Sequence, residues 1–447
     1  METIAKRSPA LLWLLLLSGA HRAGAQPSKP SWKFDFGPGK AAAGYQQVLP
    51  TAGYSAETGY GFDFGTTVTG VDRGGKNALT GDFITSRQPF YFSANVPEGN
   101  YNVTVTLGDL KGESRNFIKA ESRRLLLQTT STKPGQLITQ TWTINVKNRR
   151  ISTGGQVSLK PRELKKLDWD DKLTLEFDGE PTALVALEIA PAPAATTIFL
   201  AGNSTVVNQD DEPWAAWGQM LPQFFKPGVA VANHAESGLS LASFLGSHRL
   251  EKVLSVMKPG DYLFIEFGHN DQKEKGPNDG PFLAYTERLK LYISEARKKG
   301  GIPVLVTSTS RRSFGAGGKI ENSLGDFPAA VRQVAQQENV PLIDLNALTT
   351  TLYEAMGEEE SKKAFVHYPA NTYPGQTEAL ADNTHFNPYG AYEVARCVVE
   401  GMKTAKLALV KYLRTDIPPF DPAHPDALAQ WHWFESPRSA VTKPDGN

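Results

Sequence analysis

The second half of the chain alternates short apolar runs with stretches whose apolar residues recur at helical spacing. Trp217, Leu221 and Phe224 recur in this way and predict a helix over about residues 213–225. The other expected helices are residues 289–296, 327–337 and 389–402. The expected strands are residues 198–200, 229–232, 262–267, 303–306 and 341–345. Strands that alternate with such helices form βαβ units, so we expect a parallel five-stranded sheet in a three-layer α/β/α sandwich.

The first half has a different pattern, with period-two alternation and no long helical stretch. The expected strands are residues 32–36, 60–64, 89–92, 101–107, 125–127, 136–146, 172–177 and 184–189. Many short strands separated by Gly, Pro and Asp turns predict an antiparallel β-sandwich. Such a domain either binds sugar or packs against its neighbour. Trp169 is the one obvious aromatic candidate for sugar binding, which slightly favours packing.

A run rich in Ala and Pro, residues 190–195, reads as a linker between these two regions. It divides a β-sandwich domain, residues 26–193, from an α/β domain, residues 194–447, whose prolines after Asp416 predict an irregular tail. Two domains suit a chain of 447 residues, which exceeds the roughly 300 at which one core stops growing.

The first 25 residues are expected to be a secretory signal. Lys6 and Arg7 precede a short apolar run, and a small-residue cleavage site ends before Gln26. The run is too short to span a bilayer, and no other segment reaches the ~20 apolar residues that a crossing requires. The mature protein is therefore expected to be secreted or periplasmic, with no membrane partner.

Charge and cysteine content narrow the function further. Lys+Arg and Asp+Glu are equal at 47 each, without strong clustering of either sign, so nothing indicates nucleic acid as a partner. Cys397 is the single cysteine, which excludes internal disulfides, and its helical pattern fits a small buried hydrophobe. The oligomeric state is open.

Polar residues follow the expected strands where a parallel sheet binds its ligands. Ser204 follows the first strand, Gly238 the second and Asn270 the third, while Asp382 and His385 lie three apart before a helix start. Each alone is more often a turn or cap residue than a catalytic one. A serine with a histidine and an acid is, however, the set that nucleophilic catalysis requires.

Four of these segments resemble the sequence blocks of the SGNH (GDSL-type) hydrolases. They read LAGNSTV, NHAESG, FGHND and DNTHFN, and FDFGPG and GYGFDFG resemble the leading part of a two-domain bacterial type. The chain looks most like the rhamnogalacturonan acetylesterase group of carbohydrate esterases. The resemblance covers nearly all of the expected mature chain and implies an SGNH hydrolase domain behind a galactose-binding-like β-sandwich.

The resemblance also implies roles for individual residues. Ser204 would be the nucleophile, His385 the general base and then acid, and Asp382 the carboxylate that orients the imidazole. The backbone N–H groups of Ser204 and Gly238 and the side-chain amide of Asn270 would form the oxyanion hole. No cofactor or metal is expected, because acyl-serine hydrolysis needs none and no HExxH pattern is present.

The chain departs from the family's usual Gly-Asp-Ser at one position, where Asn203 replaces the aspartate. His234 and His269 compete with His385 for the base role, but neither has an acid three residues before it, so we interpret them as pocket lining or structure. Asp271 is expected to fix its loop.

The expected function is therefore an esterase that removes O-acetyl groups from pectic rhamnogalacturonan, with an acetylated polysaccharide or oligosaccharide as its partner. Two alternatives stay open. One keeps the chemistry and changes the substrate to xylan or another acylated glycan, because loops set specificity. The other is a non-catalytic carbohydrate-binding protein, to which Asn203 is the single pointer.

Overall fold

The structure is a computed structural model that describes residues 1–2, 31–437 and 445. Ser31–Asn447 form one compact unit. Almost all of the expected signal segment, residues 1–25, lies outside the described residues. Within the described part of the chain, no helix is long and apolar enough to cross a membrane.

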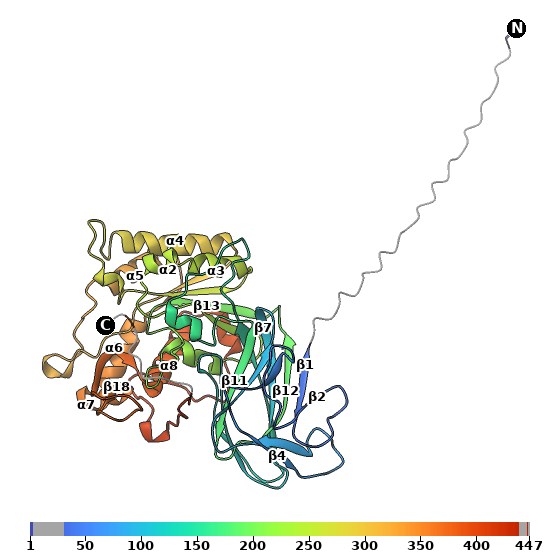
Figure 1. Cartoon of the computed structure of the whole chain (residues 1–447). Helices are drawn as coiled ribbons and strands as arrows, with labels where there is room; N and C mark the ends of the chain where they lie inside the picture. The colour runs from blue at the N-terminus through green and yellow to red at the C-terminus, as the bar shows by residue number, and fades with distance from the viewer. Residues whose placement is uncertain (3–30, 438–444, 446–447) are drawn as a thin grey trace. The chain divides into compact units, whose positions relative to one another are not determined.

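The first region is a sandwich of two sheets, as predicted (Figure 1). One sheet contains β10 (Leu137–Val146), β7 (Gly99–Gly108), β12 (Leu184–Pro191), β1 (Trp32–Phe36) and β2 (Gln46–Val48), with β5 (Asp82–Thr85) and β4 (Thr69–Asp72) joined at β12. The other contains β3 (Tyr60–Asp63), β6 (Phe90–Asn95), β11 (Lys172–Gly179), β8 (Ser114–Ala120) and β9 (Arg124–Thr132). In both sheets of the sandwich the paired strands are antiparallel, except that β1 and β2 of the first sheet are parallel. Alternate residues such as Val103 and Val105 are fully buried between the sheets, which is the origin of the period-two pattern.

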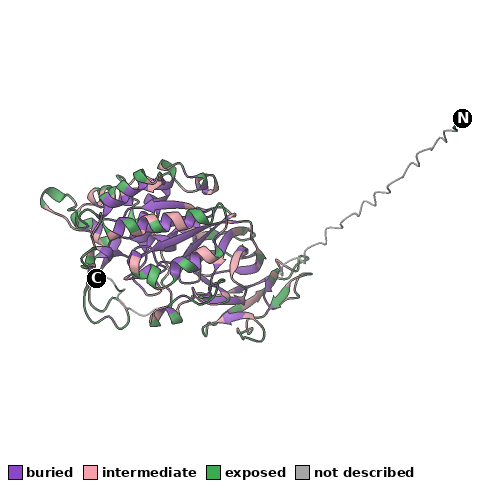
Figure 2. Cartoon of the chain, turned by 90° about the horizontal axis from the view of Figure 1, so that it is seen from above, coloured by how far each residue is buried: buried purple, intermediate pink, exposed green. Residues whose placement is uncertain are grey.

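The second region has the expected parallel sheet, in the order β14 (Val229–Asn233), β13 (Thr196–Gly202), β15 (Tyr262–Glu266), β16 (Ile302–Val306) and β17 (Leu342–Ile343). Ile198 and Leu200 of β13 belong to one buried cluster and Phe199 and Ala201 to another, so both faces of the sheet are covered. Figure 2 shows the sheet buried between its helices. The predicted three-layer α/β/α sandwich is confirmed.

Helices from both halves of this region form the outer layers (Figure 1). One layer contains α2 (Leu241–Gly246), α3 (Arg249–Val256), α4 (Ala284–Lys298) and α5 (Phe327–Gln337). The other contains α1 (Trp217–Met220), α6 (Leu345–Met356) and α8 (Pro388–Thr404). The remaining elements are α7 (Glu358–Ser361), the hairpin of β18 (Phe365–Tyr368) and β19 (Leu380–Phe386), and 3₁₀ turns at Pro161–Lys165, Leu221–Phe224, Asp271–Lys273, Ala316–Gly318, Lys362–Ala364, Ala408–Tyr412 and Leu428–Gln430.

One predicted helix is much shorter than expected. Over residues 213–225, only Trp217–Met220 is α-helical, followed by a 3₁₀ turn. The segment before it cannot join the helix, because Ala216 is extended and the N–H of Ala215 donates to the carbonyl of Phe386. The apolar spacing there reports burial against the sheet rather than a long helix.

The segment between the two regions is not a free linker. β12 extends to Pro191, the N–H of Ala192 donates to the carbonyl of Asn100, and Ala195 is buried. Phe117 and Leu125 of the β-sandwich lie in the same buried cluster as the helices of the α/β region. The two regions therefore share part of their core.

Candidate active site

Three turns meet at the carboxyl edge of the parallel sheet. Ser204 follows the end of β13, Gly238 follows β14 and Asn270 follows β15. The turns are joined by hydrogen bonds, since Gln209 donates its amide to the carbonyl of Ser204 at 3.0 Å and to the hydroxyl of Ser237 at 3.4 Å. Parallel strands end at one edge, so the spacing in the sequence becomes proximity in space.

Ser204, His385 and Asp382 form a continuous hydrogen-bonded chain. His385 Nε2 lies 2.8 Å from Ser204 Oγ, and His385 Nδ1 lies 2.8 Å from Asp382 Oδ2. All three residues are buried: Ser204 is 3% exposed, His385 1% and Asp382 7%. A hydroxyl, an imidazole and a carboxylate in this order can take a proton from the serine and stabilise the resulting imidazolium.

His385 and Asp382 lie in strand β19, which the sequence pattern did not predict. The strand pairs with β18, where Val366 is opposite Asp382. The predicted helix start follows, since the side chain of Asn387 accepts from the N–H of Gly390 at 3.0 Å. The imidazole is thus fixed on one side by a β ladder and on the other by a capped helix.

The electrostatics favour an ionised Asp382. Burial by itself would raise the pKa of this carboxyl, but hydrogen bonds from the His385 imidazole and from the backbone N–H groups of His385 and Thr384 hold the pKa well below its usual range. The carboxylate is therefore charged throughout the neutral range and can orient the Nδ1 proton of His385.

Gly238 and Asn270 follow β14 and β15, the strands on either side of β13, and are the residues expected to donate to an oxyanion. Gly238 has a φ of +79°, a conformation that favours glycine. The amide of Asn270 donates one hydrogen to the carbonyl of Leu239 at 3.1 Å, which links the β14 and β15 turns and leaves its second hydrogen for a ligand.

Glu266 is a buried carboxyl behind the nucleophile turn that the sequence reasoning missed. Its oxygens contact Trp217 Nε1 at 2.6 Å and Thr205 Oγ1 at 3.0 Å. Burial raises the pKa of Glu266 to about 7, although both hydrogen bonds oppose the rise. Its position as the last residue of β15, opposite Gly202, is the signal that points to it.

Asn203 is fully buried and holds the turn through Thr205. Its Oδ1 accepts from the N–H of Thr205 at 3.0 Å and from the hydroxyl of Thr205 at 2.9 Å. Among the described residues, the Asn203 Nδ2 amide has no hydrogen-bond partner. The Thr205 hydroxyl has one proton, which it donates either to Asn203 Oδ1 or to Glu266 Oε1, so it joins the nucleophile turn to the end of β15.

The competing histidines lie in closed surroundings. His234 and His269 are buried, and burial is the first cause that lowers the pKa of both imidazoles well below their usual value. Asp271 accepts from the N–H groups of Gly268 and Leu241 at 2.9 Å, the contacts of a residue that fixes its loop. Trp169 lies edge-on to His234 at 5.5 Å and within 4.5 Å of Lys147 Nζ.

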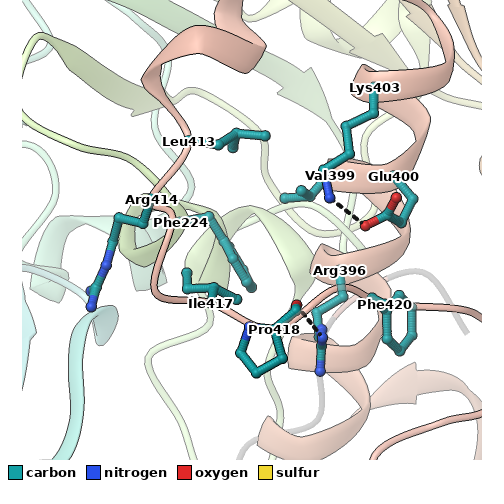
Figure 3. Close-up of a pocket in the computed structure, with 10 residues that line it drawn as sticks. All are labelled: Phe224, Arg396, Val399, Glu400, Lys403, Leu413, Arg414, Ile417, Pro418 and Phe420. Atoms are coloured by element: carbon teal, nitrogen blue, oxygen red, sulfur yellow. Dashed lines mark hydrogen bonds and ion pairs between the residues drawn. The ribbon is translucent and has the colours of Figure 1, made fainter.

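Cavities also lie outside the triad. One of about 310 Å³ adjoins the triad strand and has aromatic and polar walls that include His367, Asn387, Trp431 and Trp433. A smaller one of about 40 Å³ lies between the second half of α8 and the following segment, lined by residues such as Arg396 (Figure 3). Its volume suits one or two waters rather than a sugar. Within the described residues, no group of His, Cys, Asp and Glu is arranged to hold a metal ion.

Comparison with known proteins identifies the family of each region. Residues 200–392 match the GDSL-like lipase/acylhydrolase family, and residues 32–155 match the beta-agarase/YXIM esterase-like, galactose-binding domain-like family. Rhamnogalacturonan acetylesterase RhgT of Bacillus subtilis is 45% identical over 218 residues, which cover 48% of this chain and 93% of that protein.

A longer match runs through both regions. The uncharacterized esterase YxiM of Bacillus subtilis is 27% identical over 387 residues, 84% of this chain and 92% of its own. The crystal structure of YxiM covers 85% of this chain and 99% of its own at 26% identity, with a TM-score of 0.44. The chain therefore belongs to the GDSL-like lipase/acylhydrolase family, with a galactose-binding-like domain before its hydrolase domain, and it is a carboxylic ester hydrolase.

Proposed function

We propose that this hydrolase removes O-acetyl groups from rhamnogalacturonan, a pectic polysaccharide, through an acyl-serine intermediate. The 45% identity to a rhamnogalacturonan acetylesterase over nearly its whole length is the observation that carries the substrate. The aromatic and polar cavity beside β19 supports a carbohydrate ligand, because sugar rings pack on aromatic faces while their hydroxyls need polar partners.

The Ser204–His385 contact supports the first half of the proposed reaction. His385 Nε2 takes the proton of Ser204 as Oγ forms a bond to the acetyl carbonyl carbon. The carbonyl π electrons move to its oxygen, which the N–H groups of Ser204 and Gly238 and the amide of Asn270 would stabilise. The ester bond to the sugar then breaks, and the sugar oxygen leaves with the proton held at Nε2.

The second half repeats these steps with water. His385 takes a proton from water, the hydroxide adds to the acyl carbon, and the Ser204 oxygen leaves with the proton from Nε2, which releases acetic acid. Asp382 stays ionised and holds the imidazole in the tautomer that both halves require.

Acetate release from 4-nitrophenyl acetate tests the chemistry. Wild type should turn over this ester, and Ser204→Ala should lose nearly all of that turnover, because it removes the hydroxyl that lies 2.8 Å from His385 Nε2. Retained turnover in Ser204→Ala would remove the nucleophile assignment, and an inactive wild type would favour a carbohydrate-binding protein.

A panel of polysaccharides tests the substrate. Wild type should release acetate faster from acetylated rhamnogalacturonan than from acetylated xylan at equal acetyl concentration. Equal rates on the two polymers would contradict the pectic preference, and a higher rate on xylan would assign the enzyme to that glycan.

We also propose that the protein acts outside the cytoplasm, as the signal-like residues 1–25 indicate. Expression of the full chain in its host, followed by mass spectrometry of the exported protein, should find a new amino terminus at Gln26. Full-length protein confined to the cytoplasm would contradict export.

A further inference from the structure

Two basic side chains of the β-sandwich region reach the glycine of the proposed oxyanion hole. Lys160 Nζ donates to the carbonyl of Ser237 at 2.7 Å, and Arg162 donates to the same carbonyl at 3.2 Å. A Cβ atom placed on Gly238 would lie 3.2 Å from Lys160 Nζ. The ammonium group is therefore in contact with the edge of the site where the ester carbonyl would bind.

The backbone that carries these side chains is firmly anchored. In the 3₁₀ turn Pro161–Lys165, the buried Glu163 accepts two hydrogen bonds from Arg249, both at 2.6 Å. Glu163 also accepts from the N–H of Lys160 at 2.8 Å. A turn fixed in this way places Lys160 reproducibly at the rim of the site.

The basic side chains next to Lys160 are paired with a buried carboxylate, Glu236. Glu236 pairs with Arg162 and with Lys166, whose ammonium lies 3.2 Å away. Burial alone would raise the pKa of Glu236, but Lys166, Arg162 and Arg249 lower it to about 2. Glu236 is therefore a permanent anion whose charge is used inside the cluster, and Lys160 faces outward with its side chain 30% exposed.

The outward charge of Lys160 is met by a carboxylate. Among the described residues, its single ion pair is to Asp445, with Lys160 Nζ 2.8 Å from Asp445 Oδ2, and Arg162 lies 3.3 Å from the same oxygen. The Asp445 Cβ would be 2.9 Å from a Cβ on Gly238, so the aspartate side chain fills the space beside that glycine. The Asp445 side chain is 55% exposed, which makes this carboxylate displaceable by a ligand.

We propose that Lys160 and Arg162 form a subsite for the carboxylate of a uronate residue in the substrate, in the position that Asp445 occupies here. This inference rests on the proposed function and gives it a physical basis for selectivity. A galacturonate residue of rhamnogalacturonan carries a carboxylate that the subsite would bind, whereas a neutral acetylated sugar gains nothing from it. The β-sandwich thereby contributes directly to substrate binding.

Competitive inhibition tests the subsite without requiring a pectic substrate. Turnover of 4-nitrophenyl acetate is measured with galacturonate or galactose as inhibitor at matched ionic strength. In wild type, galacturonate should bind at least about tenfold more tightly than galactose, because a charge-assisted hydrogen bond contributes about this much. Lys160→Met should lose most of this discrimination, and Lys160→Arg should retain most of it.

A matched control separates the subsite from general charge effects. Lys133 is an exposed lysine in the turn between β9 and β10, and Lys133→Met should keep the wild-type ratio of the two inhibition constants. Asp445→Ala should lower the inhibition constant for galacturonate at least twofold, because it removes the competing carboxylate. Equal inhibition by the two sugars in wild type, undiminished discrimination in Lys160→Met, or no gain in Asp445→Ala would overturn the proposal.

The outcome for the subsite is distinguishable from the outcome for the proposed function. If wild type deacetylates rhamnogalacturonan but does not discriminate galacturonate from galactose, the subsite is wrong and the proposed function stands. If the discrimination is present but acetylated xylan is the better substrate, the subsite stands and the pectic assignment is wrong.

Discussion

At the residue scale, the Asn270 amide has a structural role and an expected catalytic role, and an experiment can separate the two. One of its hydrogens binds the carbonyl of Leu239, and we expect the other to donate to the oxyanion. Removing one oxyanion donor typically lowers kcat by ~100- to 1,000-fold, because the donor acts on charge that develops in the transition state. Asn270→Ala should therefore lower kcat on 4-nitrophenyl acetate by roughly this factor, with a small change in KM.

The lost Leu239 contact also affects stability, so thermal unfolding of Asn270→Ala is measured in parallel. A variant that still unfolds cooperatively has lost catalysis and not its fold. Lys275→Ala in the same loop, with an exposed side chain, should keep wild-type kcat. A kcat reduction below about fivefold in Asn270→Ala would contradict the donor role.

The buried Glu266 makes stability depend on pH. Its folded-state pKa of about 7 exceeds the usual value of 4.5, so the folded protein binds more protons than the unfolded chain and stability falls as pH rises between these values. Between pH 5 and 8, the free energy of unfolding should fall by roughly 2–3 kcal/mol more in wild type than in Glu266→Gln. The amide is nearly isosteric and still accepts from Trp217 while it donates to Thr205.

Urea unfolding of both proteins at pH 5 and pH 8 checks this difference. The comparison with Glu266→Gln cancels the titration of the other carboxyls, including Asp382, whose lowered pKa acts in the opposite direction. Parallel pH profiles for the two proteins would show that Glu266 is ionised in the fold and that Thr205 donates to it instead.

At the scale of elements, the cap of α8 fixes the catalytic strand. Asn387 accepts from the N–H of Gly390 and donates to the carbonyls of Lys363 at 2.8 Å and Phe365 at 3.2 Å. Asn387→Ala removes the cap and should lower the free energy of unfolding by ~1–2 kcal/mol. Asn387→Ser retains a capping oxygen and should recover about half of the loss.

Chemical denaturation measures the stability of both variants, and kcat on 4-nitrophenyl acetate reports on His385, which is two residues before the cap. Because the cap holds the end of β19, kcat should fall in Asn387→Ala and less so in Asn387→Ser. Equal stability of Asn387→Ala and wild type would mean that the β18–β19 ladder alone fixes this segment.

Elements were predictable from the sequence where one face or both faces of a regular structure are buried. Strands β13 to β16 are continuous apolar runs, and α5 was located at residues 327–337 because its apolar stripe is regular. The 213–225 segment misled because its apolar residues are buried in an irregular turn. The short α2 and α3 and the long α6 were not predicted from the pattern.

Some residues of the site could likewise be predicted from the sequence, and others could not. Ser204, Gly238 and Asn270 follow strands whose ends must converge, so their meeting could be anticipated. Glu266 could not be distinguished from other strand-end acids, because its role depends on Trp217 and Thr205, which lie elsewhere in the sequence. The reach of Lys160 across from the β-sandwich was equally hidden, since nothing in the sequence gives the packing of one region on the other.

At the scale of the whole molecule, the segment after α8, residues 405–437, packs against the β-sandwich and so connects the two regions. Lys119 of β8 is completely buried, and its ammonium donates to Glu176 at 2.8 Å and to the carbonyl of Phe434 at 2.8 Å. Trp433 packs edge-on against Phe117 at 5.4 Å and donates to Glu212 at 3.0 Å. The expected irregular tail therefore carries structural contacts, because a charged group from the sandwich is satisfied by its backbone.

Because Lys119 binds both the sandwich and the segment after α8, its replacement should lower the free energy of unfolding of the whole molecule. Lys119→Met fills a similar volume but leaves Glu176 and Asp178 buried without their cation, 2.8 and 3.3 Å from where the ammonium was. Breaking one partner of a buried pair typically costs ~3–5 kcal/mol, because the remaining charge is uncompensated. Ser436→Ala removes the hydroxyl that accepts from Lys119 and donates to Glu176, and should cost less, ~1.5–3 kcal/mol, because the two charged groups keep each other as partners.

Urea unfolding followed by tryptophan fluorescence and by far-UV circular dichroism measures both losses. Since the sandwich and the α/β region share a core, the two signals should change together in wild type and in Ser436→Ala. In Lys119→Met the cost should shrink at low pH, because burial already raises the pKa of Asp178 well above its usual value and protonation neutralises this stranded carboxyl. Equal stability of Lys119→Met and Ser436→Ala at neutral pH would contradict this prediction. Hydrophobic contacts such as Trp433 on Phe117 would then hold the segment after α8 in place, and the buried charges would stabilise the packing of the two regions only weakly.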